Sequence, residues 1–469
     1  MKTRPLFPCL LALTLLPGAA LSGRATTVVV TTVADAGPGS LRDAVNFAGT
    51  NAGGAVITFD PALEGQPIIL LLASGELVLS NQVTIDASAL TNGMTIIADR
   101  NVRYPSAFRI IEVAANSSVE LDNLTIAGGC AFPPVDPAGE GGGIRVDAGA
   151  VALTLNHCTL SHNYAYIRGG AIAALGGSVT LNHCTITRNV AGPGPSLSVA
   201  SGGGIYSGGA VVINNSSLSG NVAIGQGGGT WGQSVTLNNS TLCDNYALGA
   251  GGGMGEVTQV NNSTLSGNSA PFGGGIYSHT ININNSTLSE NTALIRGGGL
   301  EKAFGVGNLT NTIVARNVAP TNSDIFGIFS NANSLTNGNP LLAPLGNYGG
   351  PTQTMPPLAG SPAIDGGNDS VTNFLATDQR GYPRLSGAHV DIGAVELQGV
   401  SATNGPVLKL TFTSSPDTDF TVLASTNVTL ASSLWTPLGL ALQNPPGQYQ
   451  FNDLAAPNYP HRFYQVVSP

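Results

Sequence analysis

The sequence repeats a short phrase that ends in asparagine, and this repeat constrains the fold more than any other feature. One copy, over residues 156–163, reads Asn-His-Cys-Thr-Leu-Ser-His-Asn, and another, over 238–245, reads Asn-Asn-Ser-Thr-Leu-Cys-Asp-Asn. Pairs or triplets of glycine lie between the copies. A unit this short cannot bury its own apolar face, so the copies must stack on one another. The closing asparagine recurs at intervals of 26, 32, 24, 23, 23 and 26 residues, at Asn163, Asn189, Asn221, Asn245, Asn268, Asn291 and Asn317.

Within each copy, apolar and polar residues alternate, which is the pattern of a β-strand. Residues 234–242 read Ser-Val-Thr-Leu-Asn-Asn-Ser-Thr-Leu, and no copy has the three- and four-residue apolar spacing of a helix. The Leu-x-x-Leu-x-Leu frame of leucine-rich repeats is also absent. The repeat length suits a parallel β-helix, in which each turn adds one strand to each of three sheets. We therefore expect an all-β solenoid of about ten turns.

Stacking gives each repeated residue type a structural role. The central Leu or Ile of each phrase, such as Leu160 and Ile186, would form an apolar column inside the solenoid. The seven closing asparagines would form a ladder of side-chain amides at a bend, where asparagine tolerates the left-handed conformation. Cys158 and Cys184 occupy a slot that holds serine in later copies, so we expect them to be small interior residues.

Charged residues are scarce, and this excludes some functions. They make up 9% of the chain, and the net charge is −9. With 17 Lys and Arg residues and no basic run, the sequence lacks the positive surface that nucleic acids require, so no nucleic-acid partner is expected. A charge repeated on every turn would also repel its own copies about 4.8 Å away, which favours neutral residues in a stacked repeat.

The N-terminus has the pattern of a secretory signal peptide. Lys2 and Arg4 precede an apolar stretch at 6–16, and small residues follow at 18–20. This stretch of 11 residues is too short to span a hydrocarbon core about 30 Å thick. No later apolar stretch reaches the length of about 18 residues that a membrane-spanning helix needs. We expect a protein without a transmembrane span that is secreted or held at the cell surface or outer membrane.

Residues from about 120 to 320 resemble a known family. The phrase Gly-Gly-Ile-Tyr at 203–206 and 274–277, and the phrase Leu-Ser-Gly-Asn at 265–268, are similar to the repeats of secreted right-handed parallel β-helix proteins, such as the polymorphic outer-membrane proteins. That family has Gly-Gly-x-Ile and Phe-x-x-Asn, and the Phe position is mostly Leu here. The resemblance implies a right-handed three-sheet solenoid with a role in adhesion or carbohydrate contact, and it implies no reaction.

The segments flanking the repeats resemble other parts of exported bacterial β-helix proteins. Residues 39–48 are typical of a short helix with a capping box at Ser40 and Asp43, and such a helix would plug the N-terminal end of the solenoid. Residues 339–396 resemble the choice-of-anchor segment that closes such proteins, and the C-terminal strands suggest a small β-sandwich. The expected domains are a signal peptide (1–24), an N-terminal cap with irregular first coils (25–120), regular repeats (121–335), the choice-of-anchor-like segment (336–398), a linker (399–406) and the β-sandwich (407–469).

Some β-helix proteins are enzymes, and their carboxylates cluster on neighbouring coils. Asp244 and Glu290 share a repeat slot here but lie two turns, about 10 Å, apart, with Gly267 between them. The signature motifs of polygalacturonases are absent. We therefore expect no catalytic residues and no cofactor. The alternative is a polysaccharide lyase or glycoside hydrolase whose site lies in the irregular segments, with the candidates Asp60, Asp86, Arg100, Arg103, Arg109 and Glu112.

Two histidines and two cysteines raise the question of a metal site. His157 and His183 lie on adjacent turns, next to Cys158 and Cys184. Because successive residues of a strand point to opposite faces, the imidazoles and the thiols cannot converge on one ion, and we expect no metal. In an exported protein the two cysteines can be stacked thiols or a disulfide, and the sequence leaves both open.

Four arginines are candidate surface contacts. Arg168 and Arg296 each precede a glycine pair, and Arg188 and Arg316 each precede a closing asparagine. Five turns, about 24 Å, separate the members of each pair, so they cannot share one carboxylate and are more simply isolated surface residues. We expect an exported, monomeric, non-catalytic protein that binds a polysaccharide or a surface protein. A purely structural surface protein is a further alternative.

Overall fold

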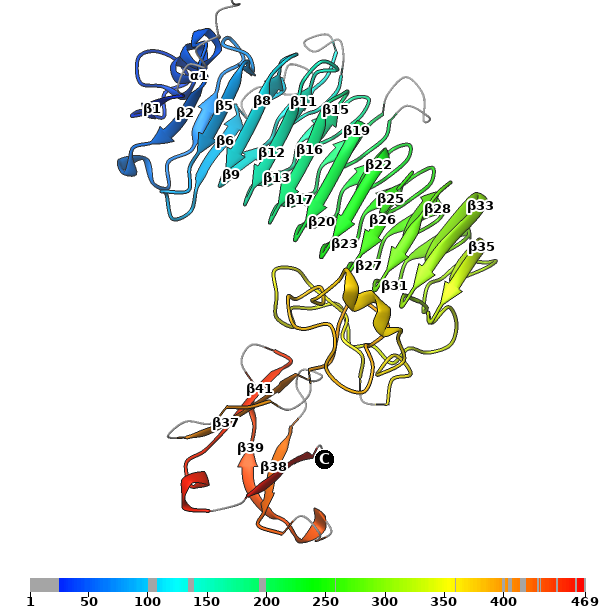
Figure 1. Cartoon of the computed structure of the whole chain (residues 1–469). Coiled ribbons are helices and arrows are strands. Elements are labelled where there is room, and N and C mark those ends of the chain that lie inside the picture. Colours follow the sequence, from blue (N-terminus) through cyan, green and yellow to red (C-terminus); the bar gives the residue numbers. More distant parts are fainter. Residues whose placement is uncertain are drawn as a thin grey trace, which may run out of the picture.

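The computed structural model describes residues 25–99, 108–133, 139–193, 200–257, 259–358, 360–398, 401–403, 407–413, 419–427, 430, 432–443, 446–459 and 462–467. The expected signal peptide, Arg100 and Arg103 lie outside these residues. The described chain is all-β, with parallel sheets followed by antiparallel ones. Figure 1 shows the parallel strands stacked along an elongated body. Within the described residues, no helix is long and apolar enough to cross a membrane.

Three parallel sheets, here called the first, second and third sheet, build this body, with 18, ten and seven strands among the described residues. The first contains β1 (Thr26–Val30), β2 (Ala55–Phe59), β4 (Leu77–Leu79), β5 (Gln82–Asp86), β7 (Ile111–Val113), β8 (Ser118–Asp122), β11 (Ile144–Val146), β12 (Ala152–Asn156), β15 (Ile172–Ala174), β16 (Ser178–Asn182), β19 (Ile205–Asn214), β22 (Thr230–Asn238), β25 (Met254–Gly255), β26 (Gln259–Asn261), β29 (Ile276–Ser278), β30 (Asn282–Asn284), β33 (Leu300–Thr310) and β35 (Ile325–Ala332). The second contains β3 (Ile68–Leu70), β6 (Met94–Ala98), β9 (Leu124–Ala127), β13 (Thr159–Ser161), β17 (Thr185–Thr187), β20 (Ser217–Ser219), β23 (Thr241–Cys243), β27 (Thr264–Ser266), β31 (Thr287–Ser289) and β34 (Ile313–Val314). The third contains β10 (Cys130–Ala131), β14 (Tyr164–Ala165), β18 (Val190–Ala191), β21 (Val222–Ala223), β24 (Tyr246–Ala247), β28 (Ser269–Phe272) and β32 (Thr292–Arg296).

Successive copies of the repeat pair with one another in a constant register. In the second sheet, Leu160 pairs with Ile186, and Ile186 pairs with Leu218. All three side chains are fully buried. Because residues at the same repeat position stack, the apolar residues form one continuous core along the body. This arrangement is consistent with the expected parallel β-helix.

A helix forms where the sequence predicted one, at α1 (Leu41–Thr50). Ser40 is its N-cap, because the Ser40 hydroxyl accepts a hydrogen bond from the Asp43 N–H at 3.1 Å. The Asp43 carboxylate accepts from the N–H of Gly39 at 3.3 Å instead of that of Ser40, so the box is shifted by one residue. The helix buries its expected apolar face, which consists of Leu41, Ala44, Val45 and Ala48.

The ladder asparagines do not take the left-handed conformation expected of them. Positive φ falls on the residue before each one, for example 56° at His162, 55° at Arg188 and 56° at Asp244. These preceding side chains are exposed, whereas the ladder amides point inward and are hydrogen-bonded there. The tight bend is therefore made by the exposed residue, and the asparagine is required for its side-chain bonds.

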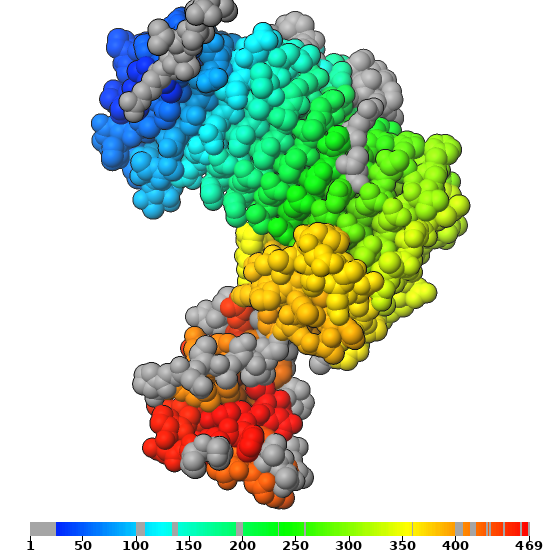
Figure 2. Space-filling model, in the orientation of Figure 1, coloured from blue at the N-terminus to red at the C-terminus, as the bar shows by residue number. Residues whose placement is uncertain are grey.

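Residues 336–398, the segment expected to follow the repeats, pack against the flank of the second sheet. Oγ1 of Thr264 in β27 donates to Oε1 of Gln379 at 2.6 Å, and the N–H of Ala394 donates to Oγ1 of Thr287 in β31 at 3.1 Å. Figures 1 and 2 show this segment, in yellow to orange, beside the later coils. The segment contains the 3-10 turn η2 (Asp369–Asn373). Another 3-10 turn, η1 (Pro61–Leu63), lies near the N-terminus. The hydrogen bonds of Thr264 and Thr287 explain why this face of the second sheet carries threonines instead of apolar residues.

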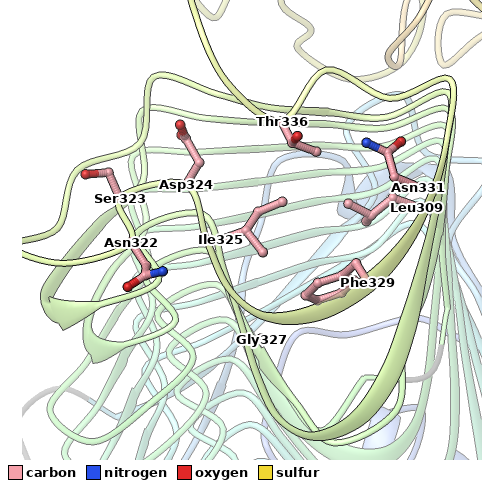
Figure 3. A pocket seen from close by; sticks show the side chains of 9 residues that line it. All are labelled: Leu309, Asn322, Ser323, Asp324, Ile325, Gly327, Phe329, Asn331 and Thr336. Carbon is pink, nitrogen blue, oxygen red and sulfur yellow. The ribbon is translucent and has the colours of Figure 1, made fainter.

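The last strand of the solenoid, β35, has a free edge. Among the described residues it pairs only with β33, and none of its residues is buried. Figure 3 shows Leu309, Ile325 and Phe329 at this end of the body, around a cavity of about 410 Å³. Polar residues such as Asp324 and Asn331 also line this cavity, and Thr336 is the one lining residue that belongs to the segment 336–398, so the segment leaves this end of the solenoid open.

The C-terminal residues form two antiparallel sheets. One contains β36 (Ser401–Thr403), β37 (Leu408–Thr413), β40 (Leu442–Gln443) and β41 (Gln448–Asp453), and the other contains β38 (Thr421–Ser425), β39 (Thr436–Leu440) and β42 (Phe463–Val467), with 3-10 turns η3 (Ser432–Leu434) and η4 (Ala456–Asn458). Leu410 and Phe412 of the first share a buried apolar cluster with Val422 of the second. Because β36 lies within the expected linker, the C-terminal sheet begins earlier than predicted.

Candidate functional site

The first sheet carries a file of residues that point away from the core, which we call the outer column. Its members pair in register on successive turns. In β19, for example, Ile205 and Ser207 are buried while Tyr206 between them is partly exposed, as strand alternation requires. The outer column consists of Val78, Glu112, Arg145, Ala173, Tyr206, Trp231, Gly255, Tyr277, Glu301 and Phe326.

The middle of the outer column is aromatic. Tyr206, Trp231 and Tyr277 are partly exposed, and Gly255 lies between Trp231 and Tyr277. A Cβ atom added to Gly255 would lie 2.0 Å from Cε3 of Trp231, so the indole rests on the bare backbone of this glycine. The result is an aromatic surface that extends over several turns, each about 4.8 Å from the next.

A cavity of about 450 Å³ opens beside this aromatic surface. Cζ of Arg296 lies 5.2 Å from the ring centroid of Phe272 and 4.2 Å from that of Phe326, so two aromatic rings hold the guanidinium. Its Nε and Nη2 donate to Oε1 of Glu301 at 3.1 and 3.0 Å. The cavity is lined by Gln226, Leu248, Gly249, Ala250, Pro271, Phe272, Tyr277, Arg296 and Glu301.

Two polar groups of this cavity are suited to binding a hydroxyl group. Only 1% of Glu301 is exposed, and its Oε2 has no hydrogen-bond partner among the described residues. Burial raises the pKa of Tyr277, and the carboxylates of Glu301 and Glu256 raise it further, so its phenol remains a hydrogen-bond donor. A buried unpaired acceptor costs stability unless a ligand satisfies it, which makes Glu301 Oε2 a candidate binding atom.

The other charged groups near the cavity are already engaged within the protein. Oε1 of Glu256 lies 2.5 Å from Nδ1 of His279. The Lys302 ammonium is buried and donates to the carbonyl oxygens of His279 and Phe304. Burial lowers the pKa of Lys302. With Arg296 bound to Glu301, this part of the outer column offers no unpaired cation among the described residues.

Ion pairs occupy the N-terminal part of the outer column. Nη1 of the buried Arg109 lies 2.8 Å from Glu76 and 3.0 Å from Glu112. Arg145, on the next turn, lies 3.6 Å from Glu112 and 3.2 Å from Asp147. These side chains neutralise one another, so this part of the column serves the structure of the first coils.

Three of the four candidate arginines are paired with acids, which corrects the interpretation that they are isolated. Arg168 lies 2.8 Å from Glu140, and its Nη1 donates to the Tyr206 hydroxyl at 2.8 Å. Arg296 binds Glu301 as described, and Arg316 forms an ion pair with Glu290. Arg168 and Arg296 border the aromatic surface, so the structure brings these two to the candidate site.

The other two arginines lie elsewhere. Arg188 and Arg316 occupy the exposed bend before a ladder asparagine, with φ of 55° and 64°. Arg188 has no ion pair among the described residues. The pair Arg316–Glu290 joins adjacent turns on the surface, and Asp244 lies beyond Gly267 on the same file. The expected acidic pair Asp244 and Glu290 therefore belongs to a solvated face.

The seven ladder asparagines lie inside the solenoid, between 0 and 6% exposed. Nδ2 of Asn189 donates to Oδ1 of Asn221 and to the carbonyl of Leu160, each at 3.0 Å. The same pattern continues to Asn317, whose Nδ2 donates to Oδ1 of Asp324 at 3.0 Å. The ladder therefore holds successive turns together, and its amides are not available to a ligand.

The histidines are exposed and the cysteines are buried, so they point in opposite directions as expected. The reason differs from strand alternation, because all four lie in the bends after β12 and β16, where His157 and His183 have positive φ of 52° and 55°. The rings of His157 and His183 are stacked, with centroids 5.0 Å apart, at the surface. Cys158 and Cys184 are buried free thiols. Their mutual hydrogen bond and burial raise the pKa of the Cys158 thiol. Within the described residues, no group of three or more His, Cys, Asp or Glu side chains could hold a metal ion.

The residues proposed for an enzymatic alternative are only partly brought together. Arg109 and Glu112 form an ion pair, and Arg100 and Arg103 lie outside the described residues. Asp60 caps η1 by accepting from the N–H of Ala62 at 2.9 Å. Asp86 accepts from the N–H of Ser88 at 2.8 Å. Each carboxylate thus has a local structural partner.

Sequence reasoning missed the aromatic part of the outer column. The signal was present, because Tyr206, Trp231 and Tyr277 each stand two residues after a glycine cluster. Those phrases indicate the fold, but the three rings line up only because the strands that carry them pair in register. The cavity was not predictable in the same way, because residues 226 to 301 meet there from several turns.

Comparison with known proteins does not assign this site. No protein-family model matches the sequence, and no curated protein matches it. The ligand must therefore be inferred from the chemistry of the outer column and its cavity.

Proposed function

We propose that this is an exported, non-catalytic protein that binds a neutral polysaccharide on the aromatic part of the outer column. The observation that carries the proposal is the surface formed by Tyr206, Trp231 and Tyr277 next to the unpaired Oε2 of Glu301. The apolar faces of sugar rings pack on aromatic side chains, and sugar hydroxyls donate to buried acceptors. A regular file of sites also suits a polymer of repeating units.

The charges favour a neutral ligand over an acidic one. A uronic acid polymer requires cations that are free to meet its carboxylates. Arg296 is bound to Glu301, Arg168 to Glu140, and Lys302 to backbone carbonyls. An acidic polymer would have to displace these internal partners, whereas a neutral one would not.

The non-catalytic assignment rests on the state of the nearby carboxylates. Hydrolysis of a glycosidic bond generally needs two carboxyl groups, one on each side of the scissile bond. Glu301 faces the cavity but is paired with Arg296, and Glu256 is paired with His279. Glu301 and Glu256 are therefore both engaged in ion pairs and do not form a free pair of a general acid and a general base.

The proposed architecture supports a role at the cell surface. We infer a right-handed three-sheet β-helix of about ten turns, with α1 plugging its N-terminal end and the two C-terminal sheets forming a β-sandwich. The resemblance to polymorphic outer-membrane proteins and choice-of-anchor segments favours attachment at the surface. We also propose that the protein is a monomer whose C-terminal parts place or anchor the binding face.

A panel of polysaccharides tests this function. The purified mature chain is incubated with neutral polymers (cellulose, xylan, mannan) and uronic polymers (polygalacturonate, alginate). Retention, reducing ends and the absorbance of unsaturated products are followed together. We expect retention on at least one neutral polymer, and neither retention on the uronic polymers nor turnover of any polymer. Turnover would support the lyase or hydrolase alternative, and no retention at all would support a purely structural role.

A further inference from the structure

A second groove lies at the opposite end of the long strands β19 and β22, about 290 Å³ in volume. We propose that it is a separate binding site for a neutral glycan. It shares the ligand class of the proposed function but none of the residues of the outer column or its cavity. The groove is lined by Asn214, Asn238, Asn239, Asn261, Asn262, Phe374, Leu375, Ala376 and Thr377.

One wall is an outer file of asparagines, distinct from the buried ladder. Nδ2 of Asn238 donates to Oδ1 of Asn214, and Nδ2 of Asn261 donates to Oδ1 of Asn238, both at 2.9 Å. An amide group has two N–H donors and two acceptor positions, and these bonds use one of each at Asn238. The partly exposed Asn238 therefore retains a donor and an acceptor for a ligand among the described residues.

The neighbouring Asn239 adds a complete amide to this wall. Its backbone carbonyl accepts from Oγ1 of Thr352 at 3.2 Å, but its side chain has no hydrogen bond within the described part of the chain. The equivalent side chain one turn later, Asn262, is bound on both sides, by Arg384 and by the carbonyl of Thr377. The segment 336–398 thus bonds to the backbone of Asn239 but, among the described residues, leaves its side-chain amide without a partner, whereas it engages the amide of Asn262.

The other wall presents an exposed aromatic ring. Phe374 follows η2, and its N–H donates to the carbonyl of Val371 at 3.1 Å. Its side chain is 61% exposed, so the ring is accessible to a ligand. A ring opposite a file of amides with free donors and acceptors is the arrangement that binds a sugar, through its apolar face and its hydroxyls.

The lining favours a neutral glycan over a peptide or an acidic polymer. None of the nine lining residues is charged. One way in which an extended peptide binds a β protein is by adding a strand to a free sheet edge. The strands beneath the groove have no such edge, because β22 pairs with β19 on one side and with β26 on the other.

Counting bound oligosaccharides tests the proposal. The mature chain is titrated with cellohexaose, xylohexaose and mannohexaose in calorimetry and native mass spectrometry, with hexaglycine as a peptide probe. We expect two hexasaccharides per chain. Phe374→Ala should weaken one site by about tenfold or more and leave the other unchanged. Phe463→Ala, which removes a partly exposed ring from β42, is the matched control.

The outcomes separate this site from the outer column. Loss of all binding in Trp231→Ala with no effect of Phe374→Ala would overturn the groove and leave the proposed function standing. Loss in Phe374→Ala alone, with a single site in the wild type, would support the groove and contradict the outer column. Binding of hexaglycine in place of the sugars, or no binding of any sugar, would overturn the groove as a glycan site.

Discussion

The indole of Trp231 rests on the backbone of Gly255, one turn further along the first sheet. The two residues pair in register, and a Cβ at Gly255 would meet Cε3 of the indole at 2.0 Å and Cζ3 at 2.2 Å. Gly255 does not have a positive φ, so its lack of a side chain is explained by this contact rather than by backbone conformation. The glycine thus leaves room for the indole on the outer face of the first sheet, between Tyr206 and Tyr277.

Gly255→Ala should therefore impair binding without unfolding the chain. The methyl group would push the indole off the sheet face, because a contact near 2 Å cannot persist. We expect a shift in tryptophan emission and at least about tenfold weaker binding of a neutral polysaccharide, with an unchanged far-UV spectrum. Unchanged emission and affinity would show that the indole position does not matter for binding.

The two asparagine files predict losses of stability of different size. Asn189→Ala removes a buried amide that bonds to Asn163, Asn221 and Leu160, and leaves these groups unsatisfied. We expect it to lower the free energy of unfolding by about 3 kcal/mol or more. Asn182 lies on the same turn as Asn189, and it extends the outer file because Nδ2 of Asn214 donates to its Oδ1. Asn182→Ala should cost less than about 1 kcal/mol because water can replace its bonds. Urea unfolding of both variants checks this, and equal losses would contradict the structural ranking of the two files.

Two buried carboxyl groups predict how the stability of the segment 336–398 depends on pH. Burial raises the pKa of Asp391 to about 6 and that of Glu396 to about 8, the latter with a contribution from Asp391. At pH values between the ordinary carboxyl pKa and these raised pKa values, the folded state holds more protons than the unfolded state. The free energy of unfolding should therefore fall as the pH rises from about 4.5 to about 8.

Thermal unfolding between pH 5 and pH 8.5 measures this dependence. Glu396→Gln keeps the shape of the side chain and removes its titration, so its melting temperature should vary less with pH than that of the wild type. A variant whose profile has the same slope as the wild type would show that Glu396 is not the group responsible.

The free edge of β35 predicts an aggregation liability. The strand reads Ile-Phe-Gly-Ile-Phe-Ser-Asn-Ala, without the charge or proline that usually protects an edge. Ile328 is 69% exposed, so Ile328→Lys should reduce aggregation on heating and change the stability by no more than about 0.5 kcal/mol. Light scattering of this variant beside Ile328→Val checks the idea, which fails if both aggregate like the wild type.

The sequence was informative where a residue's role depends on its own repeat or helix. The apolar face of α1 and the burial of Leu160 and Ile186 follow from local spacing, and the stacking of the asparagines follows from the period. The position of the segment 336–398 does not, because Thr264 and Gln379 meet across 115 residues. No local pattern encodes which face of the solenoid such a segment covers.

The candidate site lies between these cases. The aromatic residues of the outer column are visible in the sequence, but their alignment depends on repeats of unequal length staying in register. The placement of Arg296 between Phe272 and Phe326 brings together three different turns and is visible only in the folded chain. The left-handed bends were misplaced by one residue because both neighbours are polar and tolerate the conformation.

The affinity of one tryptophan variant for a neutral polysaccharide tests the central claim most directly. The chain has 2 tryptophans, so Trp231→Ala can be compared with Trp435→Ala, which lies between η3 and β39. Affinity electrophoresis is done on whichever neutral polymer retains the wild type. We predict that Trp231→Ala binds at least about tenfold more weakly and that Trp435→Ala binds like the wild type. Equal affinities of Trp231→Ala and the wild type would contradict binding on the outer column.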